Sequence, residues 1–342
     1  LKPALEGTNS VLSGLAGLDT FARGGSQKAI PADKDLAATL KTQIGAANTF
    51  ASDLQKFSGS VARSKVSETG SPKDYQAEAM VLKINGSFVN SDLRNTTQSF
   101  DARNDQKRIE ILAGARPEYR EIQDKSLAEY QAVRNEANQA LTKGDLDKAD
   151  SLAKLAGYTV DTAENAYKIA ADEHPVLNNI EGAFTNYQNL SIADKNIYDT
   201  AHANAAFELG KSFEAIKGRD TNEANRAVSL FGTSIGLQNT VVSNNNFETG
   251  LAGKSEVLSA LYNDKAAVSQ LVSAREQFTN YQRETLVQLA ARNSTPAASA
   301  LKGANIALEV AQGTVKPFEF AQAREALKEQ SQKDRLTVLE PE

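Results

Sequence analysis

The sequence contains no cysteine and no tryptophan, and its single methionine, Met80, is internal. The absence of cysteine excludes disulfide bonds, thiolate nucleophiles and cysteine-based metal sites. It also fits an exported bacterial protein, because a chain without thiols cannot form wrong disulfides in an oxidising compartment. The chain begins at Leu1, as expected of a processed mature form or a trimmed chain. We therefore expect a periplasmic, cell-surface or secreted location in preference to a cytoplasmic one.

Long apolar runs and an excess of positive charge are also missing. No stretch reaches 18 consecutive apolar residues, so we expect no transmembrane segment, while peripheral membrane contact stays open. The 38 basic and 43 acidic residues leave a net charge of -5, which argues against a nucleic-acid partner because phosphate binding needs a basic face. With 40% hydrophobic residues the chain has enough apolar content to fold.

Apolar residues recur at spacings of three and four between the eight prolines, which is the signature of amphipathic helices. The clearest case is a pair of helices over 117–142 and 146–170. The intervening Lys143-Gly144-Asp145 combines a glycine suited to the helix C-terminus with an aspartate suited to capping the next helix. No run of β-branched and aromatic residues alternates with polar ones. The sequence predicts an all-α fold, an elongated bundle of long antiparallel amphipathic helices with little or no β-structure.

The same pattern places the remaining elements. Helices are expected at 32–66, 175–187, 192–217, 222–242, 255–292, 296–312 and 318–335, and Ser191 begins a capping box before the third of these. The predicted organisation is a flexible glycine-rich segment (1–30), an N-terminal hairpin (31–116), central hairpins (117–245), C-terminal helices (255–336) and a tail (337–342). We expect these parts to form one continuous helical body.

Candidate chemical sites are few. The two histidines are His174 and His202, and Asp199 precedes His202 by three residues, as in half of a di-iron carboxylate site. A second such pair is missing, so both histidines are expected at the surface. Neither a nucleophile elbow nor a phosphate-binding glycine loop occurs. We therefore predict no catalytic, cofactor-binding or metal-binding residues, no cofactor and no enzymatic activity.

Two further surface features are predicted. Arginines and lysines near residue 108 are interleaved with acids, as on a solvated helix face; they are Arg103, Lys107, Arg108, Arg116 and Arg120. The asparagine run before Gly250 and Gly253 predicts a loop over 243–254. Exposed loops on rigid scaffolds often carry recognition, so its candidate recognition residues are Asn244, Asn245, Asn246 and Phe247.

The segment 137–156, with Gly144-Asp145, Ala149 and Ala156, resembles the helix-turn-helix core of a tetratricopeptide repeat. That resemblance implies a peptide-binding groove lined by the 119–245 region. Our principal hypothesis is instead a non-enzymatic structural or interaction protein of the bacterial cell envelope or surface. Such a protein would present a rigid helical surface to a protein or glycan, or to another copy of itself, because open apolar stripes allow self-association.

The sequence is also compatible with two further kinds of protein. One is a secreted helical-bundle toxin or effector that hides an apolar hairpin, for which 227–242 is the best candidate. The second is a bundle enzyme or metalloprotein built around His202 and Asp199.

Overall fold

The computed structural model describes residues 72–173 and 187–339. Within these ranges 93% of the residues are helical, there are nine helices and no strand, and neighbouring helices pack closely in pairs. The all-α prediction is therefore confirmed. The predicted flexible segment 1–30 and helix 32–66 lie outside the described residues, and the predicted helix 175–187 lies almost entirely outside them.

Short turns join consecutive helices, except between α6 and α9, where residues 174–186 lie outside the described residues. They are α3 (Pro72–Asn104), α4 (Gln106–Gly114), α5 (Pro117–Thr142), α6 (Leu146–Glu173), α9 (Ile192–Gly218), α10 (Thr221–Ala252), α11 (Ser255–Tyr262), α12 (Lys265–Ala290) and α13 (Ser294–Leu339). The chain groups into two compact units, and α9 and α10 contribute residues to both. Unit 1 holds the described residues 72–173 and 207–228, and unit 2 holds 187–206 and 229–339.

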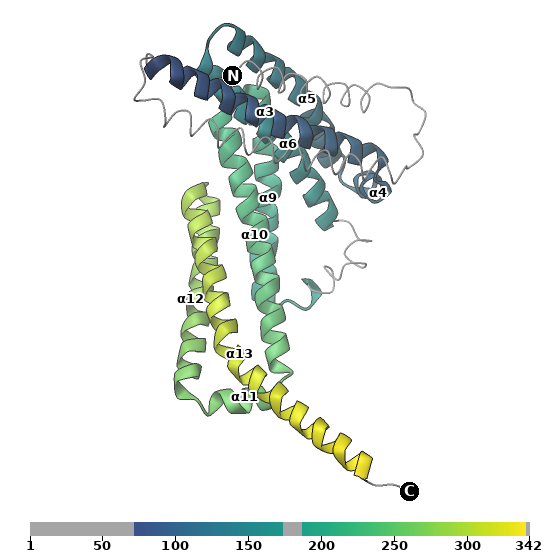
Figure 1. Ribbon diagram of the computed structural model, residues 1–342. Helices are drawn as coiled ribbons and strands as arrows, with labels where there is room; N and C mark the ends of the chain where they lie inside the picture. The colour runs from purple at the N-terminus through teal and green to yellow at the C-terminus, as the bar shows by residue number, and fades with distance from the viewer. Residues whose placement is uncertain (1–71, 174–186, 340–342) are drawn as a thin grey trace. The chain divides into compact units, whose positions relative to one another are not determined.

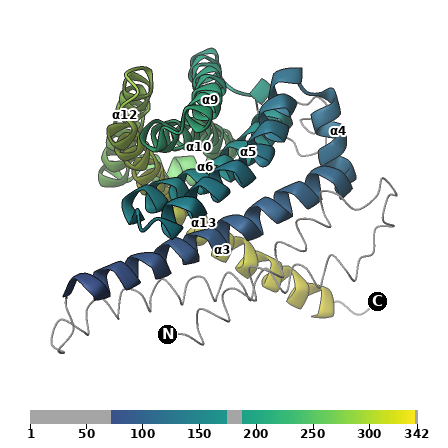
Figure 2. The same cartoon turned by 90° about the horizontal axis from the view of Figure 1, so that it is seen from above.

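Unit 1 is built on the predicted hairpin of α5 and α6 (Figures 1 and 2). Gly144 adopts a left-handed φ of 75°, as a helix-terminating glycine does, and the Asp145 carboxylate accepts the backbone N–H of Lys148 at 3.2 Å. The facing stripes bury Val133 and Val160 completely. Helix α3 packs against α6 and adds Phe88 to the same core.

Unit 2 contains an antiparallel pair, α12 and α13, that run side by side in Figure 1. The buried positions of α13 are mainly small, and those of α12 are larger. On α13 they include Ala297, Ala300, Ala304, Ala307 and Ala311, and on α12 they include Leu271, Phe278 and Leu289. Small residues on one helix let the larger side chains of the other fill the space between two closely spaced axes.

The predicted loop over 243–254 is wrong, because α10 continues as helix to Ala252 and the turn follows at Gly253 and Lys254. Asparagine has low helix propensity, but tertiary packing overrides it here. Phe247 and Leu251, one helical turn apart, pack into apolar clusters of unit 2 with residues of α11, α12 and α13. Burial of these two side chains stabilises the helix that the asparagines alone disfavour.

Three C-terminal predictions also need correction. The single helix expected over 255–292 is interrupted at Asn263, and Asp264 caps α12 by accepting the N–H groups of Ala266 and Ala267 at 3.0 and 3.1 Å. The helices expected at 296–312 and 318–335 are one helix, α13, with Pro317 inside it. Pro317 has no N–H, so the carbonyl of Gly313, four residues earlier, lacks its usual hydrogen-bond donor. Both residues are exposed, so water can donate to that carbonyl instead. Residues 337–339 of the predicted tail belong to α13.

Candidate functional site

The predicted recognition residues Asn244, Asn245, Asn246 and Phe247 lie in the last turns of α10. Phe247 is half-buried among the apolar side chains of unit 2, so its ring contributes to packing. The next residue, Glu248, pairs with Arg275 of α12. The structure therefore replaces the expected exposed loop with one turn of helix that holds α10 against α12 and α13.

The histidine and aspartate singled out in the sequence lie on α9, but each has a different neighbour. Asp199 accepts the hydroxyl of Tyr187 at 2.9 and 3.1 Å, and the Nδ1 atom of His202 lies 3.3 Å from the side-chain nitrogen of Gln238. Among the described residues no three histidine, aspartate or glutamate side chains gather as metal ligands would. His174 lies outside the described residues.

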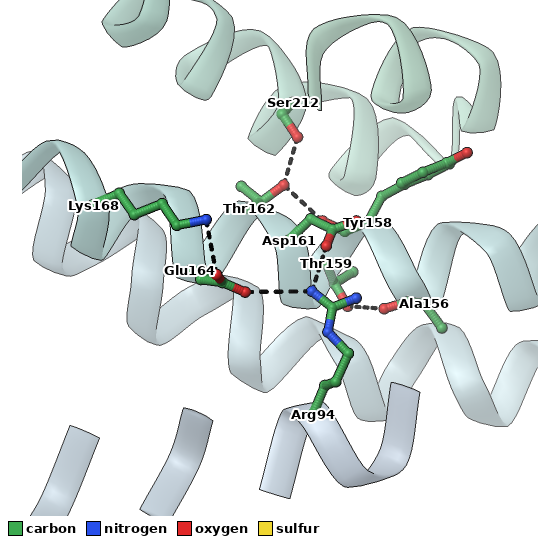
Figure 3. A network of polar contacts seen from close by, with 9 residues as sticks. All are labelled: Arg94, Ala156, Tyr158, Thr159, Asp161, Thr162, Glu164, Lys168 and Ser212. Carbon is green, nitrogen blue, oxygen red and sulfur yellow. Dashed lines mark hydrogen bonds and ion pairs between the residues drawn. The ribbon is translucent and has the colours of Figure 1, made fainter. Parts of the chain in front are cut away.

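Unit 1 contains a half-buried charged network between α3 and α6 (Figure 3). Arg94 pairs with Asp161 and lies 3.4 Å from Glu164, which also binds Lys168 at 2.8 Å. Burial alone would lower the pKa of Arg94, but the Asp161 carboxylate outweighs it and the pKa is raised. Burial favours a higher pKa for Glu164, but the hydrogen bonds and charges of Lys168 and Arg94 lower it.

A second charged group links α3 to α5. The Asp92 carboxylate accepts the Nε–H and Nη2–H groups of Arg134, at 2.7 and 2.9 Å, and the hydroxyl of the buried Tyr130 at 2.5 Å. The Arg134 guanidinium also lies 4.9 Å from the centre of the Phe88 ring. A bidentate pair with this geometry fixes the relative position of the two helices.

The prediction that Arg108 lies on a solvated face is wrong, because its exposed fraction is 4%. Its guanidinium lies over the Tyr167 ring at 4.4 Å and donates to Gln98. The side-chain oxygen of Gln123, in its favoured amide orientation, accepts from the same guanidinium. Burial lowers the pKa of Arg108, but nearby acids such as Asp101 oppose that effect. The side-chain amides of Gln98 and Gln123 accept the hydrogen bonds of this buried guanidinium. The prediction of a surface position was based only on the alternation of basic and acidic residues in the sequence.

These networks hold helices together. Among the described residues, the carboxylic acids whose pKa values shift clearly, such as Glu164, Glu136 and Asp150, all have lowered pKa values. A carboxylate with a lowered pKa is a weak base, whereas general acid–base catalysis needs a pKa near the working pH. The arrangement supports static ion pairs.

Exposed apolar side chains, by contrast, are concentrated in one part of the chain. Of the ten large hydrophobic residues that are exposed among the described residues, eight lie between Tyr262 and Leu327, on α11, α12 and α13. On α12 they are scattered around the helix. On α13 the exposed fractions are 50% for Ile306, 39% for Val310, 72% for Phe320 and 71% for Leu327.

The four exposed large hydrophobic residues of α13 lie on one face, together with three further exposed residues that complete an alternating spacing of four and three. We define the α13 outer face as Ile306, Val310, Gly313, Pro317, Phe320, Arg324 and Leu327. Ile306 follows the buried Ala304 by two residues, which places it roughly 200° around the helix at about 100° per residue. The outer face is therefore opposite the alanine stripe that packs on α12, and its spacing is that of a coiled-coil interface.

Sequence reasoning missed this face because it divided the segment at Pro317. The spacing from Ile306 to Leu327 was visible, but a proline was expected to end the first helix. In the structure the helix continues past α11 (Figure 1), and every residue from Phe320 to Gln330 except the half-exposed Gln322 is exposed.

Comparison of the chain with known protein families, with characterised proteins and with solved structures finds no match. The tetratricopeptide resemblance gains no support, because α5 and α6 have 26 and 28 residues and together exceed a 34-residue repeat. In the part of the chain that the structure describes, the helices, including the stretch 227–242 of α10, fall short of the combined length and apolarity of a membrane span.

Proposed function

We propose that this chain is a non-enzymatic interaction protein that presents the α13 outer face to a protein partner. The observation that carries the proposal is the concentration of exposed large apolar side chains on α11–α13, four of them in register on one face of α13. Single exposed apolar residues are ordinary on a protein surface, but a contiguous stripe marks an interaction site. A stripe of aliphatic and aromatic side chains suits a protein better than a glycan, because interface cores are apolar.

The α12–α13 pair supports this role by keeping the N-terminal part of the face, from Ile306 to Pro317, in a fixed geometry. The inner side of α13 packs through closely spaced alanines. Lys254, in the turn between α10 and α11, binds Glu319 of α13 at 2.7 Å. Gln322 donates to Glu256 of α11 at 2.6 Å. A rigid helix face loses little conformational entropy on binding, which favours recognition of a partner helix in a groove or of a second amphipathic helix.

Photocrosslinking in the cells that encode the protein tests the proposal. A photoreactive residue is placed at Phe320 or Leu327, and matched controls carry it at Asp124 and Ala128, which are exposed on α5. Protein adducts should form from the two α13 positions and be absent from the two α5 positions. Equal adduct formation at all four positions, or none at any, would contradict the proposal.

We also propose that the protein acts in the bacterial cell envelope or outside the cell. The support is the absence of cysteine in 342 residues, a composition that suits an oxidising compartment. Fractionation of native cells, with an antibody against the chain, should find it in the periplasmic, surface or culture fraction. Recovery in the cytoplasmic fraction would refute this part of the proposal.

A further inference from the structure

The C-terminal half of α13 lacks the packing that normally stabilises a helix. From Phe320 to Gln330 only Gln322 is less than exposed, yet the helix continues to Leu339. An isolated helix of this length is marginal in water, since most helical stability in proteins comes from burial of one face. This part of α13 carries an apolar stripe that no element among the described residues covers. We therefore expect a partner to bind along that stripe.

We propose that the partner is a second copy of the same chain, whose α13 packs antiparallel against the first through the α13 outer face. This inference rests on the proposed function, because it names the partner of the same surface. A two-fold interface is self-complementary, so each residue and its counterpart must fit in both directions.

The antiparallel register follows from the sequence of the face. In an antiparallel coiled coil the two kinds of core position lie opposite each other. If the two-fold axis passes between Phe318 and Glu319, Leu327 lies opposite Val310 of the second copy and Phe320 lies opposite Pro317. Each of these two pairs occurs twice because of the symmetry. The resulting four layers place an apolar side chain against an apolar side chain.

The one charged residue of the face also fits this register. Arg324 lies opposite Gly313 of the second copy, where a Cβ atom would meet no described atom within 4 Å, so the long side chain has room. Glu309, exposed one helical turn before Gly313, then lies within reach of the guanidinium. The pair occurs twice across the two-fold axis, and it offsets the like charge of Lys316, which is exposed three residues after Gly313 on the same flank as Glu309.

A parallel arrangement fits less well. It would place each residue beside its own copy, so that two Arg324 guanidinium groups would face each other at the interface. Like charges directly opposite are destabilising. Glu309 would have Thr314 of the second copy as its nearest flanking neighbour, with no charge to pair. The antiparallel register therefore matches the residues of the face from Val310 to Leu327 and gives Arg324 an opposite charge, whereas the parallel one does not.

The decisive experiment uses charge reversal and mixing of full-length chains, with mass measured by sedimentation equilibrium. The native chain should approach twice 36.7 kDa as concentration rises. Glu309→Arg alone and Arg324→Glu alone should each weaken dimerisation at least tenfold, because each homodimer then brings like charges together twice. An equimolar mixture of the two variants should restore dimerisation, because every pair in the heterodimer is again complementary.

Matched controls separate this result from loss of folding. Glu329→Arg makes the same charge change on the same exposed stretch but faces away from the outer face, and it should leave dimerisation unchanged. Helix content by circular dichroism should be equal in the native chain and the Glu329→Arg control, and in variants that lose dimerisation it should fall by no more than the C-terminal part of α13 accounts for. Phe320→Glu should produce a monomer with folded unit 1 and unit 2.

Three results would overturn the inference. They are a native chain that stays monomeric at every accessible concentration, single variants that dimerise as the native chain does, and a mixture that fails to restore association. If the native chain is monomeric while the α13 positions still crosslink to a different protein in cells, the inference fails and the proposed function stands. If neither association nor crosslinking occurs, both fail.

Discussion

Replacing Gly303 by alanine should destabilise unit 2, although alanine is the better helix former. A Cβ atom at Gly303 would lie 2.7, 2.8 and 2.9 Å from Cε1, Cδ1 and Cγ of Tyr281. Contact with Cγ, close to the tyrosine backbone, means that the ring cannot avoid the methyl group by moving only its outer end. The antiparallel pair of α12 and α13 must therefore separate, or Tyr281 must change rotamer.

The expected magnitude is a balance of two effects. Removing glycine from a helix interior stabilises by about 1 kcal/mol, whereas overpacking costs about 1–3 kcal/mol. The net change should be a destabilisation of roughly 0–2 kcal/mol from the same two ranges. Gly232 of α10 is the matched control, because a Cβ there meets no described atom within 4 Å. Gly232→Ala should stabilise unit 2 by roughly 0.5–1 kcal/mol.

Urea unfolding followed by circular dichroism measures both variants, compared by midpoint at equal slope. The midpoint of Gly303→Ala should lie below that of Gly232→Ala by an amount equivalent to about 1–3 kcal/mol. Adding Tyr281→Ala should remove most of the penalty, as a double-mutant cycle would show. A Gly303→Ala midpoint equal to or above that of Gly232→Ala would refute the close packing of α12 on α13.

Three further predictions concern unit 1. Asp150→Asn should lower stability at pH 7 by about 1 kcal/mol, because the native carboxylate binds Lys83 at 3.1 Å and Lys154 at 2.6 Å. Burial favours a higher pKa for Asp150, but these hydrogen bonds make it lower than usual, so its contribution is present above the unfolded pKa. The difference in melting temperature should therefore close as the pH falls below about 4; a constant difference would argue against the ion pair. Gly144→Ala should destabilise by about 1 kcal/mol because of the left-handed φ of 75°, whereas Gly210→Ala in α9 should stabilise; equal thermal midpoints would contradict this. Arg108→Ala should cost about 3 kcal/mol by urea unfolding, and Arg108→Lys should not restore it, since only a guanidinium bridges two amides over a ring; full stability of the lysine variant would refute that reading.

Local signals in the sequence were sufficient for the helix ends they directly specify. Gly144 and Asp145 end α5 and begin α6 as predicted, and the Ser191 hydroxyl accepts the N–H of Asp194 at 3.1 Å at the start of α9. Asp264 is an equally good capping residue. The sequence prediction did not use it, because the apolar spacing over 255–292 indicated one uninterrupted helix. Capping depends on atoms within three residues, so it can be recognised without knowledge of the fold.

Predictions that depended on distant residues failed. The asparagine run of α10 is helical because Phe247 and Leu251 meet residues from other helices of unit 2. Arg108 is buried because Gln98 and Gln123 lie close to it. Hydrophobic periodicity and charge balance compare residues only along one helix. They therefore cannot identify the residues of other helices that bury Phe247, Leu251 and Arg108.

The candidate site shows the same division between local pattern and long-range packing. The order of residues was enough to predict that this part of the chain is helical, but the prediction divided α13 at Pro317. It therefore did not reveal one helix with two apolar stripes, one of small residues such as Ala304 and one of larger residues such as Phe320. The inward orientation of the alanine stripe follows only from the packed helices. Hydrophobicity alone would bury the larger side chains, but α12 already fills the interface with Leu271, Phe278 and Leu289, so most of their partners on α13 are small at close-packed density. The larger stripe is consequently left at the surface for another chain to cover.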